Sequence, residues 1–443
     1  MDLRDLIVTP LFLLLIFAVA YMVRPYVTDE INRKYFLPAL SVKLLGALAV
    51  GFLYQFYYGG GDTFMYHTYG SRLIWQAFTD SPMAGLKLLF TDGKDFEGIY
   101  QYSSAIYFFH DPRSYAVIRL AAVFDLITFS TYSATACLFA VLSFIGAWQF
   151  YLAFYKQYPH LSRRLAVAAF FIPSVFFWGS GVLKDSVTLA FLGIATFQLY
   201  KIFVEGKFRI LNLLILAVSL YVIFVIKIFI LQAFLPAVIL WLGSRNIHRI
   251  RSGFLRMLVF PFMIGLLLIS SYYTVVKVGE DDDRYSVSKI AQTAKVTAYD
   301  IRYQTGRDAG SGYSLGDLDG TYGSMARLAP QAINVALFRP YVWEVRNPLM
   351  FISALESLIL LMFVLYVLIK RGRMVLPAFT KPDVIFSMTF AITFAFAVGI
   401  ATYNFGTLAR YKIPLLPFFL TGLILILDYS NSERKLSVLE ETE

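Results

Sequence analysis

The first residue whose type and position suit chemistry is an acid behind three glycines. Asp62 follows the glycines at 59–61, which end the long apolar run 36–58. A carboxylate held on a glycine turn at a membrane surface can serve as a general base for an acceptor hydroxyl. Tyr66 stands one helical turn further on, on the same face, and His67 is a candidate proton relay or metal ligand. The competing interpretation is that Asp62 only caps the helix that follows.

A second candidate is the turn at 179–186, which separates two apolar runs. Its Lys184 and Asp185 need partners at membrane depth, because a lone charge in hydrocarbon is costly. They are therefore candidate substrate-binding residues. The alternative is again local, with Asp185 or Ser186 capping the next helix while the Lys184 side chain extends to the surface.

A third candidate precedes the last apolar run, where Arg410, Tyr411 and Lys412 stand together. A phosphate explains such charges, because Arg binds it with two hydrogen bonds and Lys as a point charge. Lys227, which interrupts an apolar run, would add to the same basic site. Pairing with lipid headgroups or with a loop carboxylate is the alternative.

Two further groups lie in the long polar segment 277–346. Glu344 and Arg346 bind a ligand or each other, and the acids at 281–283 are a possible divalent-cation site, since such ions prefer oxygen ligands. Runs of acids in loops are more often simply solvated. The sequence thus identifies no certain cofactor, and a divalent cation stays open.

The elements that must position these residues are apolar. Apolar residues make up 58% of the 443 residues and charged residues 15%, whereas a soluble domain carries about 25% charged residues. Several runs reach the roughly 17–25 residues that cross a bilayer. The sequence therefore predicts an all-α polytopic integral membrane protein, a single domain over 1–443 with about 11 transmembrane helices. The candidate spans are 6–23, 36–58, 132–155, 165–178, 186–203, 210–226, 228–243, 254–276, 347–369, 384–402 and 413–428.

Lysines and arginines gather in short clusters between these runs, as the positive-inside rule expects of cytoplasmic loops. The net charge of +10 therefore reflects topology and excludes a nucleic-acid partner, because the basic residues form no single face. The clusters are Arg24/Arg33/Lys34, Lys156/Arg163/Arg164, Lys201/Lys207/Arg209, Arg245/Arg249/Arg251/Arg256 and Lys370/Arg371/Arg373/Lys381.

This orientation places 59–131 and 277–346 outside the cytoplasm together with the N-terminus, and the tail 429–443 inside. Short amphipathic stretches in the two outer loops predict helices that lie in the membrane interface. These stretches are 71–90 and 325–337, while 114–130 is either another interfacial helix or half of a broken span.

Taken together, these features resemble the GT-C superfamily of polytopic glycosyltransferases. Asp62 matches the acid that follows a span in the first outer loop of those enzymes. The PSVFFW sequence at 173–178, which leads into Lys184 and Asp185, resembles their second charged turn, and RYKIP at 410–414 resembles their last one. The chain departs from the family in having a span before the catalytic loop, Asp-Thr in place of Asp-Glu, and no large C-terminal soluble domain.

The resemblance implies transfer of a sugar from a polyprenyl-phosphate or pyrophosphate donor to a hydroxyl on the extracytoplasmic side. Asp62 would act as base, and Arg410, Lys412 and Lys184 would hold the donor phosphate. The implied partners are the lipid-linked donor, a glycan, lipid or protein acceptor, and membrane lipids. The implied location is the bacterial cytoplasmic (inner) membrane.

Three other functions compete with this one. An O-antigen-type polysaccharide polymerase also uses polyprenyl-linked glycans and needs arginines on the outer side. A transporter or flippase needs paired broken helices and a charged pathway through the membrane. A membrane subunit of an envelope assembly complex needs no shared cavity around Asp62.

Overall fold

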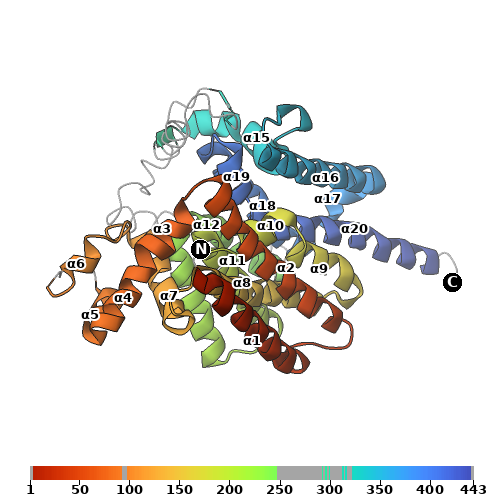
Figure 1. The fold of residues 1–443 in the computed structure, drawn as a ribbon. Coiled ribbons are helices and arrows are strands. Elements are labelled where there is room, and N and C mark those ends of the chain that lie inside the picture. The colour runs from red at the N-terminus through yellow and green to blue at the C-terminus, as the bar shows by residue number, and fades with distance from the viewer. Residues whose placement is uncertain are drawn as a thin grey trace. The chain divides into compact units, whose positions relative to one another are not determined.

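The computed structural model describes residues 3–91, 97–246, 292, 295, 296, 299, 312, 313, 315, 316 and 322–440. These residues form helices (Figure 1), with one isolated β-bridge between Gly312 and Asn404. The predicted span 254–276 and the acids at 281–283 lie outside the described residues, as does most of the loop 277–346.

Seven of the described helices are long and apolar enough to cross a membrane, or up to eight if a bent pair counts as one span. The described part of the chain is thus that of a helical protein with several membrane spans. This confirms the prediction of an all-α polytopic membrane protein. The seven are Leu3–Val27 (α1), Arg33–Tyr57 (α2 and η1), Tyr132–Tyr155 (α8), Lys184–Val204 (α11 and η4), Ile210–Asn246 (α12), Pro348–Ala378 (α16, η8 and α17) and Pro382–Ala401 (α18). The bent pair joins α19 (Phe405–Tyr411) to the helix that begins at Leu415.

The seven count Ile210–Asn246 (α12) once, although its 37 residues comprise two helices joined across a kink at Lys227, whose backbone angles are non-helical. The kink lies at the predicted boundary between 210–226 and 228–243. The predicted span 165–178 differs from the structure, because it is divided into α9 (Ser162–Phe170) and α10 (Pro173–Trp178). The break comes where a residue before proline is pushed out of the helical region, and Ile172 is accordingly extended.

The chain divides into two compact units, Met1–Ile228 and Phe229–Glu443. In unit 1 the helices run back and forth between two ends. At one end Thr9 hydrogen-bonds Ser133 over 2.7 Å, where α1 and α8 begin. At the other end the Tyr155 hydroxyl donates to Asp29 over 2.9 Å, and Lys156 pairs with Glu205 over 3.1 Å.

Residues of the predicted basic clusters of unit 1 lie at this second end, whereas Arg4, Arg72 and Lys184 lie at the Asp62 end. Lys207 also pairs with Glu205, over 2.7 Å, and Arg24 and Arg33 flank the turn that contains Asp29. Asp62 lies at the opposite end, after α2 and η1 (Leu53–Tyr57). The separation of basic clusters from the Asp62 turn therefore holds within unit 1.

The interior of unit 1 contains one lysine with three partners. The ammonium of Lys43, in α2 (Arg33–Phe52), donates to Ser143 Oγ over 2.9 Å and to the carbonyls of Val175 and Gly179 over 3.2 and 3.0 Å. Both carbonyls belong to the end of α10, where a cation is favoured. These contacts attach α2 to α8 and α10, so Lys43 holds helices together.

The segment 59–131 folds into short helices and one longer one. The stretch predicted as one helix over 71–90 contains two, α4 (Arg72–Asp80) and α5 (Pro82–Phe90), because Pro82 begins the second. The remaining elements are α3 (Asp62–Tyr66), η2 (His67–Ser71), α6 (Tyr100–Ser103) and α7 (Pro112–Thr128). The 17-residue helix α7 covers most of the stretch 114–130, for which the sequence predicts an interfacial helix or half of a broken span.

Unit 2 contains the end of α12, α15 (Tyr322–Phe338), α16 (Pro348–Arg371), α18 and α20 (Leu415–Glu440). Its core is a cluster of phenylalanine rings that includes Phe234, Phe390 and Phe418, with the last two centroids 4.4 Å apart. Between the helices α15 and α18, a Cβ on Gly399 would lie 2.1 Å from the Ala332 carbonyl oxygen, so this close approach requires a glycine.

Candidate functional site

The glycine turn before Asp62 has a backbone that only glycine adopts easily. Gly59, Gly60 and Gly61 have φ values of 65°, 142° and 126°, all in the region that L side chains avoid. A Cβ on Gly61 would also lie 2.7 Å from the Tyr54 ring. The turn thus sets the direction in which the chain enters α3 and places Asp62 in its first turn.

Asp62 is not the capping residue that the competing interpretation required. The N-cap of α3 is Gly61, and Asp62 is the first helical residue. A carboxylate in the first turn still interacts favourably with the helix dipole. Its side chain is half-buried.

A lysine lies within electrostatic reach of Asp62, and a second acid lies beside that lysine. The Lys184 ammonium is 3.4 Å from Asp111 Oδ2, and the charges of Asp62 and Arg113 also act on it. We call these four residues the Asp62 cluster. The structure therefore brings together two predicted residues, Asp62 and Lys184, and adds two that the sequence did not single out.

Asp111 is held in its ionised form by its neighbours. Its carboxylate accepts hydrogen bonds from the Arg113 backbone over 3.2 Å and from the Ser114 hydroxyl, capping α7. Burial acts to raise the pKa of Asp111, but these bonds and the charge of Lys184 outweigh it and keep the pKa below its usual value. At neutral pH the cluster therefore contains Asp111 as a carboxylate.

Asp185 and Lys227 form a buried ion pair in unit 1. Their side chains are 0% and 8% exposed, and Lys227 donates to Asp185. The capping expectation for Asp185 and Ser186 was wrong, because α11 (Lys184–Leu199) begins at Lys184 with Leu183 as N-cap. These two predicted binding residues thus satisfy each other, at the position where α12 loses helical geometry.

Tyr66 and His67 contact residues outside the Asp62 cluster. The Tyr66 ring is buried and lies 5.3 Å from the Phe108 ring. His67 is 1% exposed, and its Nε2 lies 3.4 Å from Oδ1 of Asp125, which also accepts hydrogen bonds from Ser71 and Thr135 over 2.6 Å each. The partner of His67 is therefore an acid 58 positions away that periodicity alone did not connect to it.

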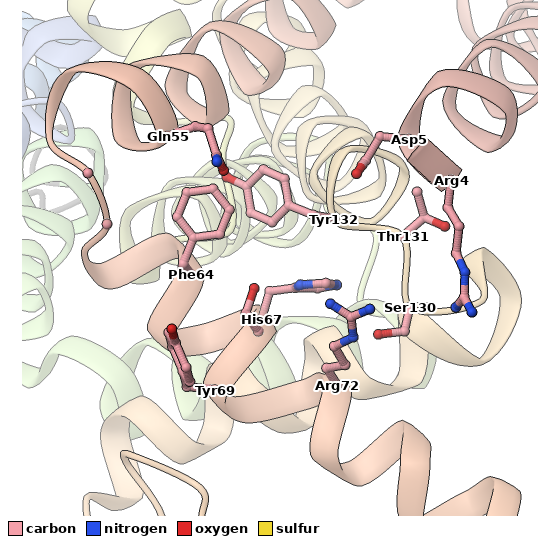
Figure 2. A pocket seen from close by; sticks show the side chains of 13 residues that line it. Arg4, Asp5, Gln55, Phe64, His67, Tyr69, Arg72, Ser130, Thr131 and Tyr132 are labelled. Atoms are coloured by element: carbon pink, nitrogen blue, oxygen red, sulfur yellow. The ribbon is translucent and has the colours of Figure 1, made fainter. Parts of the chain in front are cut away.

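Beside His67 is a cavity of about 230 Å³ at the Asp62 end of unit 1. Figure 2 shows its lining, with the His67 imidazole and the Arg72 guanidinium both pointing into the open space. The sequence offered one signal for these residues, namely polar side chains at the ends of apolar runs. The polar lining includes Arg4, Asp5, His67, Arg72, Ser130 and Thr131.

In unit 2, the predicted phosphate-binding residues differ in exposure. Lys412 is 1% exposed and donates to Ser357 Oγ over 3.1 Å, with the charge of Glu356 acting on it. Arg410 and Tyr411 are half-buried at the end of α19. Lys412 is thus already bonded within unit 2, whereas Arg410 is the more accessible of the two cations.

Glu344 pairs with Arg339, and the charge of Arg346 also acts on it. The guanidinium donates to both carboxylate oxygens, and the Tyr341 backbone N–H donates a further hydrogen bond to Oε2 over 2.8 Å. Burial acts to raise the pKa of Glu344, but these bonds lower it below its usual value. Arg339 also lies 5.5 Å from the Tyr313 ring centroid, so this pair is part of an aromatic cluster.

Among the described residues, no group of three or more His, Cys, Asp or Glu side chains is arranged to hold a metal ion. The predicted acidic run at 281–283 lies outside that part of the chain.

No protein-family model, curated protein or solved structure matches this chain.

Proposed function

We propose that this protein is a membrane glycosyltransferase that moves a sugar from a polyprenyl-phosphate or pyrophosphate donor to an acceptor hydroxyl on the extracytoplasmic side. One observation carries the proposal. A half-buried carboxylate, Asp62, and the ammonium of Lys184 lie within electrostatic reach of each other at the end of the unit 1 spans. A base so placed can accept the proton of the acceptor hydroxyl. A cation so placed can stabilise the negative charge that develops on the leaving phosphate.

In the proposed reaction, Asp62 accepts the proton of the acceptor hydroxyl. The acceptor oxygen forms a bond to the anomeric carbon while the bond from that carbon to the phosphate oxygen breaks. The donor leaves as polyprenyl phosphate or pyrophosphate, and Lys184 and Arg113 stabilise its added negative charge. The transition state has oxocarbenium character, as in glycoside hydrolysis, and water must be excluded from it.

The proposed function includes the more detailed predictions from the sequence. These are about 11 spans, interfacial helices in two outer loops, and a bacterial cytoplasmic membrane. Phosphate binding by Arg410 and Lys412 also stays a prediction. Lys227 and Lys412 are almost fully buried, at 7% and 1% exposed. Lys184 and Arg410 are half-buried, each within its own unit, so exposure favours these two as cations that can meet a substrate.

The test measures sugar transfer from a polyprenyl-phosphate donor in proteoliposomes that contain the whole chain. We expect Asp62→Asn to reduce kcat at least about 100-fold, the usual effect of losing a general base, with little change in KM for the donor. Lys184→Gln is expected mainly to raise KM for the donor.

The matched control is Glu30→Gln, which removes an exposed carboxylate at the other end of unit 1. It should leave kcat unchanged. Full activity of Asp62→Asn in the same vesicles would exclude Asp62 as the base.

A further inference from the structure

The cavity beside His67 is separate from the Asp62 cluster, since none of the cluster residues lines it. It lies where α1 begins, where η1 ends and where α8 begins, so it is at the ends of three spans. Its volume of about 230 Å³ is far larger than the ~10–15 Å³ that a single water requires. We call it the His67 cavity.

Three of its polar side chains are deeply buried and have no hydrogen-bond partner among the described residues. They are His67 through Nδ1 (its Nε2 lies beside Asp125), Ser130 through Oγ and Thr131 through Oγ1. Their exposed fractions are 1%, 4% and 2%. Buried polar groups are almost always bonded, because an unmet donor or acceptor costs free energy. Three such groups around one cavity therefore indicate a polar ligand.

The charges around the cavity favour an anion. Arg4 and Arg72 contribute two guanidiniums. The one carboxylate that lines the cavity, Asp5, already accepts hydrogen bonds from the backbone N–H of Ser133, over 2.8 Å, and from its hydroxyl. Asp125 lies behind His67 and is bonded to two hydroxyls, so it does not line the cavity.

The number and direction of the donors distinguish among anions. Two guanidiniums, two hydroxyls and one imidazole provide more donors than the two oxygens of a carboxylate can accept. They also come from different elements: α1, η2, α4 and the turn before α8. A tetrahedral oxyanion has oxygens that point in several directions and can meet such a set. Arginine is also the residue best suited to phosphate.

We propose that the His67 cavity binds a phosphate-type oxyanion, held by Arg4 and Arg72 and by the hydroxyls of Ser130 and Thr131, with His67 as a further donor. The phosphate belongs either to a membrane lipid or to a soluble phosphate. The proposal does not depend on the glycosyltransferase function, because it concerns a different cavity with different residues.

The experiment uses the purified whole chain in a neutral detergent. One arm titrates sodium phosphate against sodium chloride of equal ionic strength, and the other titrates short-chain phosphatidic acid against the neutral diacylglycerol. Binding is measured by isothermal titration calorimetry. We expect saturable binding of at least one phosphate compound, and the arm in which it occurs identifies the source.

The variants are Arg72→Gln and Thr131→Val, with Arg163→Gln as control because Arg163 is exposed at the other end of unit 1. We expect each of the first two to raise Kd at least tenfold while the control binds as the wild type does. Thr131→Val keeps the side-chain shape, so a melting temperature measured in chloride shows that it is folded. Asp62→Asn should bind phosphate normally, which separates this proposal from the proposed function.

Two results would overturn the proposal. One is the absence of saturable binding in both arms, which would mean that the cavity holds water only. The other is an equal loss of affinity in Arg163→Gln and Arg72→Gln, which would place the bound phosphate on the general basic surface.

Discussion

The ion pair between Asp185 and Lys227 is almost fully buried, with side chains 0% and 8% exposed. Removing one partner leaves the other charge in a medium that cannot solvate it, which costs about 3–5 kcal/mol. Replacing both with apolar residues leaves no unpaired charge. The pair therefore contributes more through the penalty of breaking it than through its own attraction.

We expect Asp185→Leu and Lys227→Met each to lower the free energy of unfolding by several kcal/mol, and the double variant to lose less than the sum of the two. The measurement is unfolding in mixed detergent micelles, followed by circular dichroism. Additive effects would show that the two side chains do not interact.

Asp111 allows a prediction of how stability depends on pH. Its pKa is lowered in the folded state, so folding favours its ionised form. The stabilisation is complete above the unfolded pKa of about 3.9 and is lost as the pH falls through the lower folded value.

The melting temperature of the wild type should therefore exceed that of Asp111→Asn at pH 6, and the difference should shrink as the pH falls below about 4. Ser114→Ala, which removes one bond to the same carboxylate, should show a smaller difference at pH 6. A difference that grows on acidification would contradict the assigned direction of the pKa.

At the scale of elements, the glycine turn connects the η1 segment to α3. The backbone of Gly61, at φ 126° and ψ −165°, lies in a region that is essentially restricted to glycine. The same turn lines the His67 cavity through Gly59 and Gly60. One turn therefore positions both Asp62 and part of the cavity wall.

We expect Gly61→Ala to destabilise the protein by about 1–3 kcal/mol, because the new Cβ meets the Tyr54 ring as well as an unfavourable backbone. Thermal unfolding in detergent measures this. Gly98→Ala is a matched control with a positive φ of 73° but nothing within 4 Å of the added Cβ. It should cost less, and an equal cost would mean that the contact with Tyr54 is unimportant.

At the scale of the whole molecule, the basic clusters at one end of unit 1 predict that this end faces the cytoplasm. Glu30 lies at the basic end and Gln76, in α4, belongs to the segment at the Asp62 end. The chain has one cysteine, Cys137, which is buried. Single cysteines can therefore be introduced in a Cys137→Ala background without interference.

We expect Gln76→Cys to react with a membrane-impermeant maleimide added to intact cells, and Glu30→Cys to react only after the cytoplasmic membrane is opened. The physical reason is the positive-inside rule applied to the basic end. Labelling of both positions in intact cells would contradict the orientation.

The sequence by itself determined the class of protein. The length of a span is set by the thickness of the bilayer, and the positions of the basic clusters are set by the orientation in which the chain inserts. Both can therefore be recognised from the residues of each segment alone. The same local rules found the division between 210–226 and 228–243, where two helices meet in a kink at Lys227. They differed from the structure over 165–178, where a proline divides α9 from α10.

Only the tertiary structure decided which polar residues meet. His67 and Asp125, Lys184 and Asp111, and Asp185 and Lys227 are far apart in the chain, and their pairing depends on the rotation and depth of packed helices. Hydropathy carries no such information, because it records how apolar a segment is and not which face it presents. The sequence could therefore select Asp62 and Lys184 as candidates, but packing alone showed their proximity and created the His67 cavity.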